Sequence, residues 1–157
     1  RTFKAARSKN NFNTILTHEN GAQLILGALP NNKSGDQHRI RLQAKGPFSV
    51  LSLNEPWERE DFGPSKPVKK EQWDTSEQHK YYAIDAIDHQ PLSDKHLEQA
   101  AKHIHTELTA GRSIYVHCRA GAARSRPSIT PASCRRLPTA HCTTSSRNRR
   151  ATRPPTR

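Results

Sequence analysis

The sequence has 157 residues and a net charge of +12 at neutral pH. This length suits one domain with a hydrophobic core. The charge is uneven, since residues 1–125 hold 18 Lys and Arg against 14 Asp and Glu, whereas residues 126–157 hold eight Arg and no acidic residue. No apolar run approaches the ~20 residues that cross a bilayer, and nothing at the N-terminus resembles a signal peptide, so we expect a soluble protein.

The N-terminal third predicts an arm followed by two strands. Residues 1–11 are basic and polar without periodicity, and we expect a flexible arm there. Residues 12–32 read FNTILTHENGAQLILGALPNN, and the apolar run within them leads into Gly27 and stops at Pro30. Residues 31–46 are polar and predict a loop, although Ile40 and Leu42 fit a short amphipathic element.

The middle of the chain predicts two further strands separated by a charged excursion. Residues 48–53 read FSVLSL and predict a third strand. Residues 59–79 are charged and contain Pro64 and Pro67, which favours a path over the surface. Residues 81–84 restore strand character.

The clearest predicted element is a helix of about 17 residues. Ser93 is the expected N-cap, Asp94 lies in the first turn, and Gly111 ends the helix. Its apolar stripe consists of Leu97, Ala100, Ala101, Ile104 and Leu108. Because this helix leads into the short strand Ile114-Tyr115-Val116, we predict an α/β fold with a mostly parallel central sheet flanked by helices.

Residues 117–125, HCRAGAARS, place a nucleophile and a cation on either side of a loop of small residues. Gly121 and the alanines around it leave their backbone N–H groups open to an anion, and a helix beginning near Arg124 would add its positive end. This field favours thiolate over thiol, so we expect a lowered pKa at Cys118. Arg124 would bind two phosphoryl oxygens at once, and Ser125 would donate a hydrogen bond to the departing sulfur.

This loop resembles the signature of the protein tyrosine and dual-specificity phosphatases. LGALP at residues 26–30 and Asn-Glu-Pro-Trp-Glu at residues 54–58 follow the order of that family, so the resemblance covers residues 12–125. It implies a phosphatase domain there, with Cys118 as nucleophile and Arg124 as the catalytic cation. It also implies a phosphate cradle of substrate-binding residues, namely Arg119, Ala120, Gly121, Ala122, Ala123 and Ser125.

The family also implies an aspartate that protonates the leaving group, roughly thirty residues before the cysteine. Asp88 and Asp85 both fit this spacing. We favour Asp88, because Asp88-His89-Gln90-Pro91 resembles the lead-in of phosphoinositide phosphatases, whereas Asp85 continues the preceding strand. The role stays open between the two.

The substrate class also has two candidates. Arg119 directly after the nucleophile suits strongly anionic head groups, and residues 54–58 resemble a pattern of the mitochondrial-type phosphatidylglycerophosphate phosphatases, although an acidic surface turn explains them equally well. Ala122 and Ala123 add no recognition of their own. A phosphorylated protein is therefore the leading substrate, with activity on both phosphotyrosine and phosphoserine or phosphothreonine (dual specificity). An acidic phospholipid or phosphoinositide is the alternative.

The composition indicates no cofactor and no metal. The nine histidines form no cluster at ligand spacing, and we expect them at the surface. Residues 12–125 hold a single cysteine, Cys118, which indicates a reducing compartment such as the cytoplasm, with a secreted effector as the alternative. We expect a monomer whose loop binds phosphate, sulfate or vanadate.

Residues 126–157 interrupt the family pattern. Members continue into an apolar helix, but here Pro131 and Pro138 would break a helix, and Ile129 and Leu137 are the large aliphatic residues. We hypothesise that a reading-frame shift produced this segment; the alternative is a genuine disordered tail rich in arginine. An apolar, helix-periodic segment in another frame of the encoding DNA would support the frame shift. An inactive phosphate-binding protein, or a binder of nucleic acid or acidic surfaces through this tail, is the alternative of another class.

Overall fold

The computed structural model describes residues 12–73, 78–88 and 90–119, and contains a five-stranded sheet with the strand order β1-β2-β5-β3-β4. β1 is antiparallel to β2, whereas β2, β5, β3 and β4 run parallel to one another. The strands are β1 (Phe12–Thr17), β2 (Gln23–Ala28), β3 (Phe48–Ser52), β4 (Lys80–Ala83) and β5 (Ser113–Cys118). The predicted α/β class with a mostly parallel sheet is confirmed.

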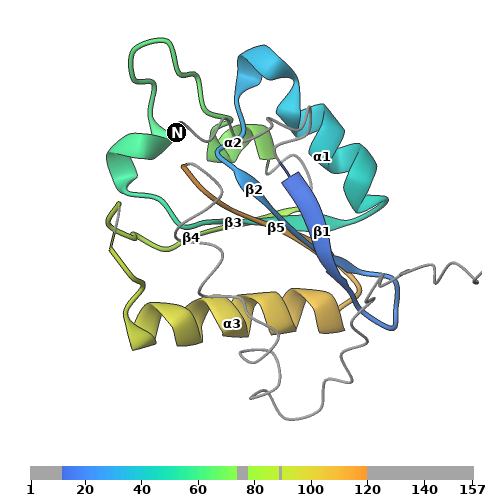
Figure 1. The fold of residues 1–157 in the computed structure, drawn as a ribbon. Helices are drawn as coiled ribbons and strands as arrows, with labels where there is room; N and C mark the ends of the chain where they lie inside the picture. Colours follow the sequence, from blue (N-terminus) through green and yellow to red (C-terminus); the bar gives the residue numbers. More distant parts are fainter. Residues whose placement is uncertain (1–11, 74–77, 89, 120–157) are drawn as a thin grey trace, which may run out of the picture.

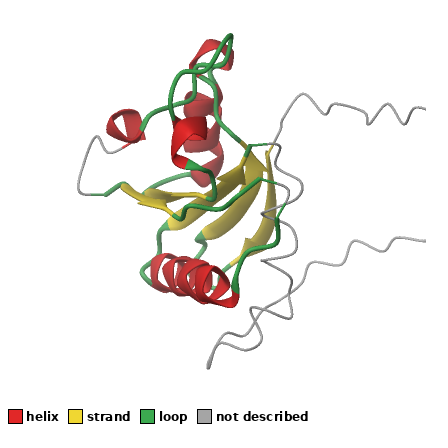
Figure 2. Cartoon of the chain, turned by 90° about the vertical axis from the view of Figure 1, so that its left-hand side faces the viewer, coloured by secondary structure: helices red, strands yellow, loops and turns green. Residues whose placement is uncertain are grey.

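Helices cover both faces of the sheet. The long helix α3 (Asp94–Thr109) lies on one face, and α1 (Asp36–Ala44) and α2 (Lys70–Trp73) lie on the other (Figure 1; Figure 2). Two 3-10 helices, η1 (Asn32–Ser34) and η2 (Pro56–Arg59), follow β2 and β3. None of the helices that the structure describes is long and apolar enough to cross a membrane.

The helix α3 forms as the sequence predicted. The Ser93 side chain accepts a hydrogen bond from the His96 backbone N–H at 3.3 Å, which satisfies one donor of the first turn. Ala100, Ile104 and Leu108 are buried against the sheet. Burial of this stripe holds the helix antiparallel to the strands that flank it in sequence.

The central strand β5 is buried along its whole length. Its side chains alternate between two cores: Ile114, Val116 and Cys118 pack in the core that includes α3, while Tyr115 packs in the core that includes α1. A strand with parallel neighbours on both sides and helices over both faces has no solvent-facing side.

Residues 31–46, predicted as a loop, instead contain η1 and α1, so the loop prediction is wrong there. Ile40 and Ala44 are buried one turn apart and hold α1 on the sheet, while Leu42 is 63% exposed. Two apolar contacts in nine residues give too weak a period to reveal a helix in the sequence.

The charged segment 59–79 lies only in part at the surface. At the surface Lys66 pairs with Asp61 and Lys69 with Glu60, but Val68 and Trp73 are buried in the core beneath α1, with Trp73 packed edge to face on Phe48 at 5.8 Å. The prediction of a surface excursion is therefore wrong for these two residues.

A buried carboxylate ties α3 to the sheet at the end away from Cys118. Glu107 is fully buried and accepts hydrogen bonds from Arg112 Nε at 2.6 Å, Tyr82 Oη at 2.9 Å and Ser49 Oγ. Burial raises the pKa of Glu107, but these hydrogen bonds outweigh it and lower the pKa to about 2. The carboxylate stays charged, and it joins α3, β3 and β4 to the chain that enters β5.

Candidate functional site

The carboxyl ends of four parallel strands meet at one edge of the sheet, and Cys118 lies there. In the register of the sheet Cys118 pairs with Ala28 of β2, and Ser52 of β3 pairs with both His117 and Ala83. Within the described residues Cys118 forms no disulfide, and it is 1% exposed. In open α/β sheets ligands bind at this edge, so the strand order places the predicted nucleophile where a site is expected.

His117 is buried beside the nucleophile, so the expectation that the histidines lie at the surface is wrong for it. Its ring stacks on Tyr115 at 5.6 Å, and among the described residues its Nδ1 has no hydrogen-bond partner. Burial, and secondarily the charge of Arg59, lowers the pKa of His117 to about 3, against an opposing effect of Glu58. The imidazole is therefore neutral at physiological pH.

Residues 54–58, which follow β3, form a turn at the same edge with buried polar side chains at its two ends. Asn54 and Glu58 are both fully buried. The Glu58 Oε2 atom accepts hydrogen bonds from Asn54 Nδ2 at 3.1 Å and from the Glu55 backbone N–H at 2.9 Å. These bonds satisfy polar groups that would otherwise be costly to bury, so the reading as an acidic surface turn is wrong for Asn54 and Glu58, whereas Pro56 and Trp57 are exposed.

Glu55 joins this turn to the segment that carries Asp88. Its Oε1 atom accepts a hydrogen bond from the Asp88 backbone N–H at 2.9 Å, and its Oε2 atom accepts one from the Trp57 indole N–H at 2.8 Å. One carboxylate therefore joins its own turn to a residue 33 positions further along the chain.

Arg119, the residue after Cys118, lies against two aromatic rings. Its guanidinium carbon is 5.5 Å from the centroid of the Trp57 ring and 5.1 Å from that of Phe62. The two rings contact each other edge to face at 5.6 Å. Cation–π contacts of this kind orient a guanidinium while leaving its N–H donors available to an anion.

Asp85 and Asp88 have different surroundings. The Asp85 carboxylate forms an ion pair with Arg59, whose other terminal nitrogen donates to the Asn54 carbonyl at 3.0 Å. This ion pair joins η2 to the segment that follows β4. Asp88 lies three residues further along, in the loop that Glu55 holds.

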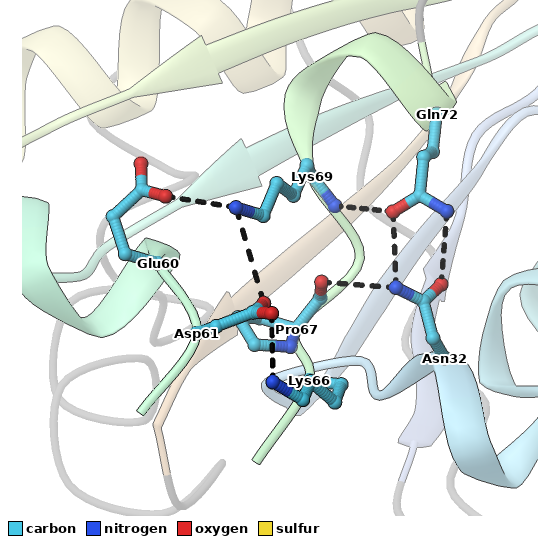
Figure 3. Close-up of polar contacts among 7 residues, drawn as sticks. All are labelled: Asn32, Glu60, Asp61, Lys66, Pro67, Lys69 and Gln72. Carbon is cyan, nitrogen blue, oxygen red and sulfur yellow. Dashed lines mark hydrogen bonds and ion pairs between the residues drawn. The ribbon is translucent and has the colours of Figure 1, made fainter. Parts of the chain in front are cut away.

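The segment that carries Phe62 is fixed by a polar network (Figure 3). Lys69 forms an ion pair with Glu60 at 2.9 Å, and Lys66 forms one with Asp61 at 2.8 Å. The Asn32 side chain donates to the Pro67 carbonyl at 3.2 Å and exchanges two amide hydrogen bonds with Gln72, at 3.0 and 3.1 Å. These contacts tie the segment to η1 and α2, and so restrict where the Phe62 ring can lie.

The other predicted site residues, Ala120, Gly121, Ala122, Ala123, Arg124 and Ser125, and the whole of residues 126–157, lie outside the described residues. Within residues 12–73, 78–88 and 90–119, no group of His, Cys, Asp and Glu side chains has the arrangement of a metal site.

Sequence reasoning did not single out Glu55, Phe62 or Arg59 as site residues. Glu55 and Arg59 stand within or directly after the Asn-Glu-Pro-Trp-Glu stretch, which was noted for its resemblance, so a signal existed for them. Phe62 had none, because its contact with Arg119 joins segments far apart in the chain.

No family model and no curated protein matches this sequence. Among solved structures, the chain is similar to PTPMT1 in complex with PI(5)P, with a TM-score of 0.55 and 19% identity over 71% of this chain and 64% of that one. It is also similar to a mutant form of Tk-PTP, with a TM-score of 0.51 and 18% identity over 70% of this chain and 64% of that one. The chain thus spans less than two thirds of the length of either protein, and over that part it has the fold of the protein tyrosine phosphatases.

Proposed function

We propose that this protein is a phosphatase that hydrolyses phosphomonoesters through a cysteinyl-phosphate intermediate. One observation carries the proposal: a continuous series of contacts connects the residue after Cys118 to the candidate acid. Arg119 packs on Trp57, Trp57 donates to Glu55, and Glu55 accepts from the backbone of Asp88. Cys118 and the segment that carries Asp88 are thus linked at one edge of the sheet, which supports their proposed roles as nucleophile and acid.

In the proposed reaction, the Cys118 thiolate attacks phosphorus, a sulfur–phosphorus bond forms, and the bond from phosphorus to the ester oxygen breaks. The Asp88 carboxyl donates its proton to the departing oxygen. The resulting carboxylate then takes a proton from water, which attacks phosphorus and releases inorganic phosphate and the thiolate. Arg124 and the backbone N–H groups of residues 120–125 are the proposed stabilisers of the transferred phosphoryl group.

Phosphotyrosine, phosphoserine and phosphothreonine in proteins are the leading substrates of this proposal. An anionic phospholipid is the second candidate, favoured by the exposed Arg119 between two aromatic rings and by the occurrence of PI(5)P with the structurally similar PTPMT1. Comparing turnover of phosphopeptides with turnover of phosphoinositide in vesicles distinguishes the two.

The experiment that tests the proposal is hydrolysis of para-nitrophenyl phosphate by the full chain. We expect Cys118→Ser and Arg124→Ala to abolish turnover, chelators to have no effect, and vanadate to compete because it mimics five-coordinate phosphorus. Cys142→Ser is the matched control and should retain turnover. Undiminished turnover by Cys118→Ser would overturn the covalent mechanism.

A further inference from the structure

We propose that Glu55 is a positioning residue, which holds the Asp88 loop and the Trp57–Arg119 pair in a fixed relation through its two carboxylate oxygens. The contacts themselves are structural, while their effect on catalysis rests on the phosphatase function proposed above. The Asp88 N–H lies 2.9 Å from Oε1 and the Trp57 indole N–H lies 2.8 Å from Oε2.

The backbone of Glu55 is itself fixed, so its carboxylate is a firm attachment point. Glu55 is the N-cap of η2 in an extended conformation, with φ of −63° and ψ of 151°, and Pro56 follows at the first helical position. The Glu55 backbone N–H donates to the buried Glu58 carboxylate at 2.9 Å. Little conformational freedom remains to be lost when the side chain accepts its two hydrogen bonds.

The loop that follows β4 needs such an attachment. Ile84 N–H still donates to the Ser52 carbonyl at 2.9 Å, but residues 85–88 and 90–93 lack helix and strand structure and continue no regular ladder. Gln90 N–H donates to the Ile87 carbonyl at a long 3.4 Å, whereas Asp88 N–H reaches a carboxylate at 2.9 Å. A charged acceptor makes the stronger hydrogen bond, so Glu55 restricts the loop at the residue that carries the candidate acid.

The same carboxylate also orients the substrate side of the site. With its N–H bonded to Glu55, the Trp57 indole presents its ring to Arg119 at 5.5 Å, although the side chain is 48% exposed. An arginine stacked in this way directs its donors toward an anion bound at the strand edge.

Glu55→Gln is a sharp test because it keeps the shape of the side chain but has a single acceptor oxygen. One of the two N–H donors would then face an NH₂ group. Glu98→Gln is the matched control, because it removes the same charge from an exposed position of α3.

The first part of the test does not require the protein to have catalytic activity. We expect amide hydrogen exchange at Asp88 to become about tenfold faster or more in Glu55→Ala, and to be unchanged in Glu98→Gln, because a hydrogen bond to a charged acceptor protects that N–H. Equal exchange at Asp88 in wild type and Glu55→Ala would overturn the proposal, whether or not the protein is a phosphatase.

The second arm measures how turnover depends on the leaving group. We expect Glu55→Gln to lower kcat for alkyl phosphates about tenfold, with kcat for activated aryl phosphates nearly unchanged, because the latter depart without protonation. In an Asp88→Asn background the Glu55→Gln change should have no further effect on kcat. Equal losses on both substrates would indicate a merely structural role and overturn the positioning role. Absence of turnover by the wild type would instead overturn the proposed function, and the exchange arm would still decide whether Glu55 holds the loop.

Discussion

Acid should destabilise this protein through His117, and the size of the effect follows from its burial. The residue is 2% exposed, and its pKa is lowered from 6.5 to about 3. Between these two values the unfolded chain binds a proton that the folded protein does not. The free energy of unfolding therefore falls as pH falls below 6.5, by about 1.4 kcal/mol per pH unit, and the full contribution of His117 is present above pH 6.5.

At pH 5 the expected loss is about 2 kcal/mol relative to pH 8. This loss depends on the pKa of the unfolded chain alone, because the folded pKa lies well below pH 5. Urea unfolding at pH 8 and pH 5 measures it, as the difference between wild type and His117→Gln, since the other titrating groups are common to both proteins.

His117→Gln should lower stability at pH 8 but reduce the pH dependence by about 2 kcal/mol. His38→Gln, which removes an imidazole from an exposed position of α1, is the matched control. Parallel pH dependences of wild type and His117→Gln would refute the reasoning, because they would mean that His117 takes up its proton equally in both states.

Three further predictions concern the buried carboxylate, the acid and the cation. Glu107→Gln should cost about 3 kcal/mol in urea unfolding, because it leaves the Arg112 charge without its carboxylate, whereas Glu98→Gln on the exposed side of α3 should cost little. Asp88→Asn should slow turnover of alkyl phosphates about 100-fold and of activated aryl phosphates little; a larger effect of Asp85→Asn would move the acid role to that residue. Arg119→Ala should raise KM about tenfold for phosphoinositide in vesicles but not for a small aryl phosphate, and equal KM changes would argue against its role in selecting anionic substrates.

The sequence predicted those elements whose signals are local and periodic. The helix α3 has a cap, a stripe and a terminating glycine within one segment, and the apolar run of β5 marks a buried strand. The helix α1 was missed because Ile40 and Ala44 are its only buried residues. The burial of Val68 and Trp73 depends on which face of the sheet a charged segment crosses, and no local pattern encodes that choice.

The site residues also differ in whether a local sequence signal could reveal them. Cys118 was placed correctly at the end of a central strand, because a strand followed by a loop of small residues is a local signal. His117 was misjudged because its neighbours in the strand alternate between two faces that are both covered, which follows from the strand order rather than from the residue itself. Glu55 acts on residues 33 positions away, and such a contact emerges only from the fold.

The central claim is the covalent intermediate, and trapping it is the most direct test. Turnover of a phosphomonoester by Asp88→Asn, quenched rapidly in acid and followed by peptide mass spectrometry, should reveal one phosphoryl group on the peptide that contains Cys118, because this variant lacks the base that activates water. Phosphate release without any phosphoryl group on Cys118, together with unchanged release by Cys118→Ser, would contradict the mechanism.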